Sequence, residues 1–570
     1  MIFWLLSLCS LACATKLLDR NLVYRSPFHD LPEFSRDTKG IHKRFVGHAK
    51  RQLGDATVFN DEHYPTFYGS DFSNSPFIWT GGVTFTHANP LDDSVLLWTR
   101  AVPTSVVGGS TPVPDQSVPV FTSPSLSGKP VSTGEAFTSY DVDFTVKVEA
   151  TGLKPDTKYW YLFADCAKST STSPVGVTRT ISRPDTPASQ VNGGKNLSIA
   201  VFSCSRFQDG YFNAYGFAAH NTSVDIFVHL GDYANFSLTD NVRLSAPIGR
   251  GVLGRELATI HDYRQRLAQY RTDASLQFAH QNAPWITVSD NSWKAGTVDS
   301  NDTAAGCSFS PSGACFTDRK LAAVRAYHEW MPVRQVDVDD KLRIWRNFQI
   351  GKLLDLTMLD TRNYDRDLTD VIVNTISSFP NRSMMGLTQE NWFFDTLSTS
   401  KKRGAVWRVI GQQVDAWDGY RASRARVLNH IEQNKIDNTI ILSGDSHANW
   451  VSDLARKGGL GVEFAGTAVT STSPFGAGVA PATADAISRV LVANNTDLQW
   501  SEGSFRGFFL ITVSPSTLTA TYYAMNNISN PNLDGFASAH FVVEEGANKL
   551  SRPVAGGSVK AGVLKSNVTG

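Results

Sequence analysis

The chain has 570 residues, of which 41% are hydrophobic and 19% are charged. A chain of this length exceeds what one hydrophobic core usually organises, so we expect at least two domains. The composition is globular and excludes a disordered or collagen-like chain. Lysine plus arginine equal aspartate plus glutamate at 53 each, so no charge bias favours nucleic acid or an anionic membrane as partner.

Residues 1–14 predict a signal peptide, with a buried N-terminal helix as the alternative interpretation. This stretch is apolar but too short to span a bilayer, and it ends in the small residues Ala12, Cys13 and Ala14, which fit a signal-peptidase site. No later run is long and apolar enough to be a membrane anchor. We therefore expect a protein that is secreted, either extracellular or retained in the cell wall.

The remaining cysteines and the glycosylation sequons fit export. Cys307 and Cys315 lie in a loop rich in Gly, Ser and Pro, and could close a small disulfide ring. Together with the signal peptide, the Asn-X-Ser/Thr sequons suggest a glycosylated secretory protein. The sequons begin at Asn221, Asn235, Asn301, Asn381, Asn494, Asn527 and Asn567.

Two segments precede the larger part of the chain. Residues 15–76 are polar and irregular, which indicates an N-terminal extension or a propeptide. Residues 77–190 contain short β-rich runs separated by Pro, Gly, Ser and Asp, which predicts an all-β, fibronectin-III-like sandwich that supports the rest of the protein. The predicted strands cover residues 83–87, 94–99, 118–122, 144–148 and 159–163.

Residues 191–548 alternate apolar, strand-like runs with amphipathic helical stretches, which predicts an α/β layered domain. We expect helices over residues 258–276 and 321–330, and a C-terminal tail over residues 549–570. The predicted strands cover residues 197–202, 225–230, 352–359, 406–410 and 439–442.

Chemically capable side chains directly follow these strands. They are Cys204, Asp232, Asp360, Asp445 and His447. Because strand carboxyl ends converge on the ligand crevice of open α/β sheets, we expect one shared site. Any single aspartate there could instead be a turn residue or helix cap. The combination of carboxylate, imidazole and thiolate suggests a metal cluster.

Other residues near these strand ends complete the expected site. Gly444 lets the loop with Asp445 and His447 approach a metal or phosphate closely. Arg206 and Arg362 could bind a substrate phosphate through paired hydrogen bonds, or could instead form structural ion pairs.

An ordered set of motifs resembles the PhoD-type family of alkaline phosphatases and phosphodiesterases, within the metallophosphoesterase superfamily. Residues 85–87 and 96–100 also resemble the N-terminal β domain of that family. The matching motifs are residues 202–206 (FSCSR), 229–233 (HLGDY), 327–334 (YHEWMPVR), 359–364 (LDTRNY), 389–393 (QENWF), 411–414 (GQQV), 443–450 (SGDSHANW) and 464–467 (FAGT).

The resemblance implies a β-sandwich metallophosphatase domain flanked by helices, and a secreted, monomeric phosphoester hydrolase. Its cofactors would be Fe(III) and Ca²⁺, and its substrate a small or polymeric phosphate ester. A metal-activated hydroxide would attack phosphorus in line. The implied metal ligands are Cys204, Asp232, Asn235, Asp445 and His447, with Arg206, Asp232 and His447 as the catalytic residues and Arg206 and Arg362 as phosphate contacts.

The sequence departs from the family pattern at two places. Asn235 stands where the family has a tyrosine, two residues beyond Tyr233. After Thr287 the family continues into an Asp-Asp-His-Glu block that supplies metal ligands and an acid/base histidine, whereas this chain continues into Asp290 and Asn291. Loss of a ligand weakens a metal site severely. Two alternatives follow: a catalytically impaired PhoD-like protein that binds phosphate esters, or a cell-surface glycoprotein.

Overall fold

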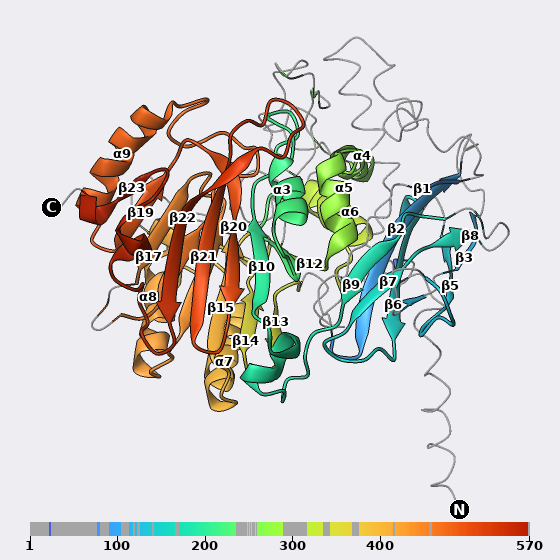
Figure 1. Ribbon diagram of the computed structural model, residues 1–570, viewed down its shortest axis with the longest axis horizontal. Helices are drawn as coiled ribbons and strands as arrows, with labels where there is room; N and C mark the ends of the chain where they lie inside the picture. Colours follow the sequence, from blue (N-terminus) through green and yellow to red (C-terminus); the bar gives the residue numbers. More distant parts are fainter. Residues whose placement is uncertain are drawn as a thin grey trace, which may run out of the picture.

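A computed structural model (Figure 1) describes most of the chain from residue 91 onward. Several predictions lie outside the described residues, namely the signal peptide at residues 1–14, the metal ligand Asn235, and the disulfide between Cys307 and Cys315. The described residues are 22–23, 77–79, 91–103, 113–117, 120–121, 126–138, 142–165, 170, 172–234, 248, 250, 252, 257, 259–288, 316–334, 343–367, 376–413, 417–454, 456 and 459–567.

Two β-sheets pack face to face and form the centre of the molecule (Figure 1). The six-stranded sheet has the order β12-β11-β10-β20-β21-β22. Its strands are β10 (Leu197–Phe202), β11 (Ile226–His229), β12 (Trp285–Thr287), β20 (Arg506–Val513), β21 (Thr517–Met525) and β22 (Gly535–Glu544).

The eight-stranded sheet has the order β13-β14-β15-β16-β18-β17-β19-β23. The strands β14, β15, β16 and β18 run parallel to one another. The strands are β13 (Arg346–Ile350), β14 (Leu354–Met358), β15 (Trp407–Gln413), β16 (Thr439–Gly444), β17 (Asn449–Asp453), β18 (Val462–Ala465), β19 (Leu498–Glu502) and β23 (Val563–Leu564).

The parallel strands β10 and β11 are nearly continuous apolar runs, as is typical of strands with both faces covered. β10 is confirmed over the residues predicted for it, 197–202, and it pairs in parallel with β11. Side chains from both sheets meet in one core, where burying each large side chain contributes about 1.5–3 kcal/mol. This core includes Ile199, Val201, Leu356, Val409, Ile440, Leu442, Phe509 and Phe541.

Helices cover the outer faces of both sheets (Figure 1). The helices that pack on the six-stranded sheet are α3 (Asn213–Asn221), α4 (Ile260–Tyr270), α5 (Ala274–Asn282) and α6 (Phe316–Trp330). The helices α7 (Gly386–Lys402) and α8 (Arg421–Gln433) pack on the eight-stranded sheet, and α9 (Pro481–Asn494) packs on β19. Within the described residues, none of the helices has the length and apolarity that a membrane span requires.

The single helical stretch predicted over residues 258–276 is two helices, α4 (Ile260–Tyr270) and α5 (Ala274–Asn282). Asp273 causes the break, because its side chain accepts a hydrogen bond from the backbone N–H of Leu276 and caps α5. Thr259 and Asp262 form a capping box at the start of α4.

The predicted C-terminal tail is, through residue 567, part of the sandwich. β23 pairs antiparallel with β19, and Leu550, Val554 and Leu564 are buried in the core between the sheets. The domain therefore extends beyond residue 548, where the sequence suggested that it ends.

The N-terminal region is all-β, with three three-stranded sheets of order β1-β2-β6, β5-β3-β8 and β4-β7-β9. Its apolar core includes Val95, Leu97, Val146, Val148 and Tyr161. The strands are β1 (Phe77–Trp79), β2 (Ser94–Pro103), β3 (Val113–Ser117), β4 (Val120–Phe121), β5 (Glu135–Thr138), β6 (Thr145–Thr151), β7 (Lys158–Tyr161), β8 (Ala164–Asp165) and β9 (Gly176–Arg179). The likeness to fibronectin III stays a prediction.

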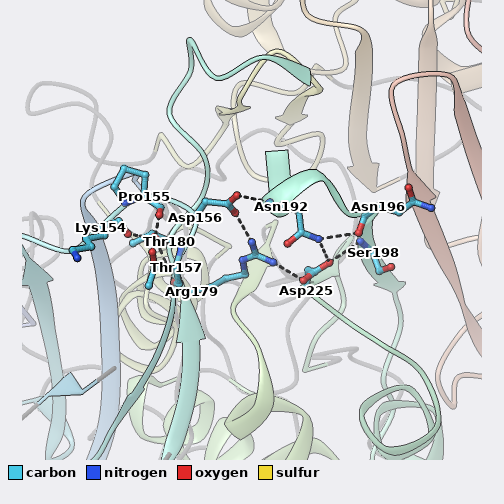
Figure 2. Close-up of polar contacts among 11 residues, drawn as sticks. Lys154, Pro155, Asp156, Thr157, Arg179, Thr180, Asn192, Asn196, Ser198 and Asp225 are labelled. Carbon is cyan, nitrogen blue, oxygen red and sulfur yellow. Dashed lines mark hydrogen bonds and ion pairs between the residues drawn. The ribbon is translucent and has the colours of Figure 1, made fainter. Parts of the chain in front are cut away.

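An arginine joins this β region to the sandwich. Figure 2 shows Arg179 between Asp156, which lies in the same β region, and Asp225, which precedes β11. The Arg179–Asp156 ion pair has an N–O distance of 2.6 Å. Asp225 also accepts hydrogen bonds from the backbone N–H of Ser198 at 3.0 Å and from the side chain of Asn192 at 3.1 Å. One guanidinium thus connects the two parts of the chain.

The C-terminal end of α6 provides a second contact with the β region. The indole N–H of Trp98 donates to the backbone carbonyl of Glu329 at 2.8 Å. The buried Lys147 ammonium donates to the backbone carbonyls of His328 at 2.7 Å and Val333 at 3.3 Å. Trp98, Lys147 and the three residues whose carbonyls accept from them are all buried. These buried hydrogen bonds therefore hold the two parts in a defined orientation.

Candidate metal centre

The candidate site forms where strands of both sheets end. Cys204 follows β10 and Asp232 follows β11, both in the six-stranded sheet. Asp445 and His447 follow β16 in the eight-stranded sheet. Backbone hydrogen bonds from Cys204 N–H to Gly231 O (3.1 Å) and from Ser205 N–H to Asp232 O (2.9 Å) continue the parallel pairing beyond the strands. These bonds fix the relative positions of the first two residues.

The structure brings these four side chains together. One ligand atom from each of Cys204, Asp232, Asp445 and His447 lies within 4.8 Å of all the others. The Cys204 thiol donates to Asp445 Oδ1 at 3.7 Å. His447 Nε2 is 4.0 Å from the same carboxylate oxygen. The donor set therefore consists of one sulfur, two carboxylates and one imidazole, which suits a transition metal.

All four residues have a left-handed backbone conformation. The φ angles are 60° at Cys204, 52° at Asp232, 64° at Asp445 and 51° at His447. This region is unfavourable for residues with a side chain, and such strain clusters at functional sites. The four residues that share this conformation are those whose ligand atoms lie together.

Two glycines make the close approach of the strand ends possible. A Cβ at Gly444 would lie 2.9 Å from Leu230 Cβ and 3.0 Å from Ser203 Cβ. A Cβ at Gly231, where φ is 110°, would lie 2.2 Å from the Gln413 side chain. Gly444 thus serves the packing of one strand end against two others, rather than exposing its backbone to a ligand as its sequence context suggested.

The Cys204 thiol lies beside two negatively charged carboxylates. Burial raises the pKa of Cys204 well above its ordinary value, and the carboxylates of Asp232 and Asp445 raise that pKa further. Without a cation, the thiol therefore keeps its proton. A bound cation would reverse this balance and stabilise the thiolate, as metal ions do for coordinating cysteines.

His447 presents an unused nitrogen to the cluster. Its Nδ1 lies 2.9 Å from the backbone carbonyl of Thr472, so Nδ1 carries the proton and donates. Its Nε2 is buried and has no hydrogen-bond partner. Burial lowers the pKa of this imidazole and favours the neutral form. A neutral imidazole oriented by a backbone carbonyl is the usual state of a metal ligand.

The two predicted phosphate-binding arginines both contact carboxylates near the cluster. Arg362 forms a close ion pair with Asp445. Arg206 pairs with Asp209 at 3.3 Å, and Thr472 also donates to that aspartate at 3.3 Å. The side chains of Arg362 and Arg206 are 5% and 26% exposed, so only Arg206 is open to solvent in this arrangement.

Asp360 lies outside the four-residue cluster. Its Oδ1 accepts hydrogen bonds from the backbone N–H groups of Arg362 at 3.0 Å and Asn363 at 2.9 Å. Gln389 donates to the Asp360 carbonyl at 2.8 Å and accepts from its N–H at 2.8 Å. The shared-site prediction is thus wrong for Asp360, which shapes the turn that carries Arg362, as aspartates after strands often do.

Two further residues support the cluster and were missed as site residues in the sequence. Gln413 Nε2 donates to Asp232 Oδ1 at 2.9 Å. Arg506 is buried and donates to the carbonyls of His447 at 2.7 Å and Ser471 at 2.8 Å. Gln413 lies in the GQQV motif, but that motif did not indicate a role for this residue. Arg506 has no comparable motif, because its proximity to His447 arises only from the fold.

Profiles of two families match the chain. The PhoD-like phosphatase profile matches residues 199–522, and the N-terminal domain of PhoD-like phosphatases matches residues 80–182. The first match includes all four residues of the cluster, and the second covers most of the all-β region.

Individual proteins resemble the chain over most of its length. Alkaline phosphatase D of Bacillus subtilis (strain 168) is 32% identical over 536 residues, which are 87% of this chain and 85% of that protein. The structure of PhoD superposes with a TM-score of 0.69 and 29% identity, covering 88% of this chain and 97% of that one. Purple acid phosphatase PPD1 from yellow lupin (Lupinus luteus) seeds shares the fold, with a TM-score of 0.50, 12% identity, and coverage of 81% and 74%. The chain belongs to the PhoD-like phosphatase family and is a phosphoester-hydrolysing enzyme.

Proposed function

We propose that this protein is a secreted, metal-dependent alkaline phosphatase or phosphodiesterase whose metal centre is built on Cys204, Asp232, Asp445 and His447. The observation that carries the proposal is the convergence of these four ligand atoms within 4.8 Å of one another. The buried Nε2 of His447, which has no hydrogen-bond partner, supports it independently. A buried polar atom without a partner calls for an explanation, and beside Cys204, Asp232 and Asp445 a bound cation supplies one.

The donor types support iron and calcium as the cations. Cys204 and His447 offer the sulfur and nitrogen that a transition metal such as Fe(III) accepts. Asp232 and Asp445 offer oxygens that could also serve Ca²⁺. When bound, these cations would supply Lewis acidity toward the phosphoryl group and activate the attacking water.

The surrounding residues hold this centre and receive substrate. Gln413 fixes one oxygen of Asp232, and the carbonyl of Thr472 holds the proton of His447 on Nδ1. Arg206 and Arg362 lie beside the cluster, where their guanidinium groups could neutralise a phosphate and orient it for in-line attack. Binding of phosphate would compete with Asp209 for Arg206 and with Asp445 for Arg362.

One observation favours the second candidate function, a catalytically impaired phosphate-ester-binding protein. The family's acidic block would follow β12, which runs parallel to β11 and ends beside the Asp232 segment. In this chain, Thr287 Oγ1 contacts the hydroxyl of Tyr327 at 2.5 Å, and that hydroxyl donates to the carbonyl of Val288 at 2.8 Å. The support for this candidate is that Asp290 and Asn291 follow β12 in the sequence, where the resemblance implies the acidic block.

Export and glycosylation are part of the proposal. The apolar residues 1–14 support a signal peptide. Among the described residues, the sequon asparagines Asn221, Asn381, Asn494 and Asn527 are all exposed, as attachment of a glycan requires. Mass spectrometry of protein from the culture medium of its native host would identify the mature N-terminus and the occupied sequons.

Hydrolysis assays separate the two candidate functions. Purified full-length protein should hydrolyse p-nitrophenyl phosphate or bis(p-nitrophenyl) phosphate, lose activity on chelation, and regain it with Fe(III) plus Ca²⁺. The ratio of the two rates would assign a monoesterase or a diesterase. If the metal-loaded protein bound phosphate but hydrolysed neither ester, the impaired-protein alternative would hold.

A further inference from the structure

A cavity of about 570 Å³ lies on the far side of the eight-stranded sheet from its core. Its walls are α8, the turn η6 (Trp417–Tyr420) before α8, and the loop between β17 and β18. In Figure 1, α8 and α9 lie at separate positions along this sheet. None of the four residues of the candidate metal centre lines the cavity.

The floor of the cavity is an incompletely covered part of the sheet. Ile441 on β16, Ser452 on β17 and Glu463 on β18 line it and are only partly buried, although β16, β17 and β18 are interior strands. Side chains in the middle of a large sheet are normally covered completely. Phe393 and Leu428 add apolar wall from α7 and α8. The space can therefore accept the apolar body of a ligand.

The polar groups on the floor form one hydrogen-bonded chain. Trp417 Nε1 donates to Gln412 Oε1 at 3.2 Å, and Gln412 Nε2 donates to Ser443 Oγ at 3.4 Å. Ser443 Oγ in turn donates to Glu463 Oε1 at 2.7 Å. Strand alternation places Gln412 on this face and its neighbour Gln413 on the face of Asp232. The chain therefore presents fixed polar groups to the cavity.

Three arginines line the cavity: Arg421 and Arg424 from α8, and Arg456 from the β17–β18 loop. The carboxyl groups of Asp418, Glu463 and Asp497 line it as well. Arg424 pairs with Asp418 at 3.1 Å, with side chains 47% and 64% exposed. Arg456 is 3.6 Å from Glu432, with side chains 39% and 42% exposed. Exposed ion pairs of this kind contribute little stability. Arg456 also donates to Asn429 Oδ1 at 2.5 Å. The guanidinium groups of Arg424 and Arg456 can turn toward a bound anion by giving up these exposed contacts.

We propose that this cavity binds a small amphipathic organic anion, with its apolar body against Ile441, Phe393 and Leu428 and its acidic head group among Arg421, Arg424 and Arg456. The volume lies within the roughly 300–1,000 Å³ range of small-molecule sites, which combine apolar walls with a few convergent polar groups. Guanidinium groups recognise carboxylate, sulfonate or phosphate heads through paired hydrogen bonds.

Glu463 agrees with an anionic rather than a cationic ligand. Burial raises the pKa of its carboxyl group, while the Ser443 hydrogen bond and Arg424 partly oppose that rise. The shift lessens the negative charge that Glu463 would present to an anionic head group. The inference does not depend on the proposed function, because it concerns binding at a place that shares no residue with the metal centre.

Binding of 1-octanesulfonate, below its micelle concentration, tests the inference by isothermal titration calorimetry on the full-length protein. Octyltrimethylammonium is the matched cation with the same tail. Arg424→Glu reverses one charge in the cavity, and Ile441→Trp fills its floor. Arg183→Glu is the control, because Arg183 is 62% exposed and does not line the cavity. Circular dichroism and a thermal unfolding midpoint for each variant show that it is folded.

We expect saturable binding of the sulfonate to the wild type and to Arg183→Glu. We expect at least about tenfold weaker binding to Arg424→Glu, which loses a charge-assisted hydrogen bond, and no binding to Ile441→Trp. Three results would overturn the inference: no saturable binding to the wild type, equal binding of the ammonium, or equal sulfonate affinity in Ile441→Trp, which would place the ligand elsewhere.

Discussion

The candidate metal centre and the junction between the β region and the sandwich both bury charged side chains, but they balance charge differently. At the junction, carboxylates face arginines: Arg179 lies between Asp156 and Asp225, and Arg100 pairs with Asp143 at 2.7 Å. At the centre, a thiol and two carboxylates converge with a neutral imidazole, and of these described residues only Asp445 faces an arginine, Arg362.

Backbone strain does not separate the two regions. All four residues of the centre have positive φ, and so do Asp156 and Asp143 at the junction. A fold gains stability by pairing charges, and it tolerates like charges where a ligand compensates for them. The meeting of sulfur, oxygen and nitrogen donors in one cluster therefore distinguishes the candidate metal centre from the junction, where carboxylates pair with arginines.

The largest expected effect separates two aspartates on either side of β11. Asp232→Asn should lower phosphoester hydrolysis at least about 100-fold, because loss of a ligand costs more than the 10- to 100-fold typical of a residue that only orients one. Asp225→Asn, at the other end of the strand, should keep its activity. Steady-state rates on nitrophenyl phosphates check both. Equal losses in the two variants would erase the distinction between centre and junction.

The next effect concerns two adjacent glutamines on opposite faces of β15. Gln413→Leu removes the hydrogen bond to Asp232 and should weaken metal binding about 10- to 100-fold. Gln412→Leu faces the outer cavity and should leave metal affinity unchanged. Metal titration of chelator-treated protein measures both affinities. An unchanged affinity in Gln413→Leu would show that Asp232 needs no orienting partner.

A smaller effect tests the junction. Arg179→Met leaves Asp156 and Asp225 without their shared cation and should lower the free energy of unfolding by about 2 kcal/mol. Arg183→Met is the control, because Arg183 is 62% exposed and should contribute less than about 0.5 kcal/mol. Denaturant unfolding compares the two variants. Identical stabilities would mean that the ion pairs in Figure 2 do not hold the domains together.

The last effect, the smallest per pH unit, is the pH dependence of Lys147. Burial lowers the pKa of its ammonium from 10.5 to about 7 in the folded protein. Between those values the unfolded chain binds more protons than the folded one, so stability should rise with pH, by up to about 1.4 kcal/mol per unit. Lys147→Met should flatten this slope between about pH 7 and 9. Denaturation midpoints across that range measure it, and a slope equal to that of the wild type would refute the assignment.

Strand positions were readable from the sequence because apolar runs report burial directly. β10 was predicted at its observed bounds, and Cys204, Asp232, Asp445 and His447 were correctly placed together after strand ends. Contacts that depend on tertiary packing were not readable. Asp360 has the same sequence context as Asp232. Its carboxylate, however, accepts hydrogen bonds from the backbone N–H groups of Arg362 and Asn363 in the turn that follows.

Other differences have similar causes. Arg506 reaches His447 from a strand 59 residues later, which no local pattern reveals. The last strand, β23, is only two residues long, too short to produce a periodic signal, so the domain end was placed too early. Local signals therefore locate elements, whereas long-range partners and short terminal strands emerge only from the assembled fold.

Elemental analysis of the purified, full-length protein tests the central claim most directly. The account predicts near-stoichiometric iron and calcium in the wild type, and loss of iron in Cys204→Ser, which replaces the thiolate with a weaker ligand. Wild-type protein that hydrolysed phosphoesters without bound metal, or Cys204→Ser with undiminished iron, would contradict it.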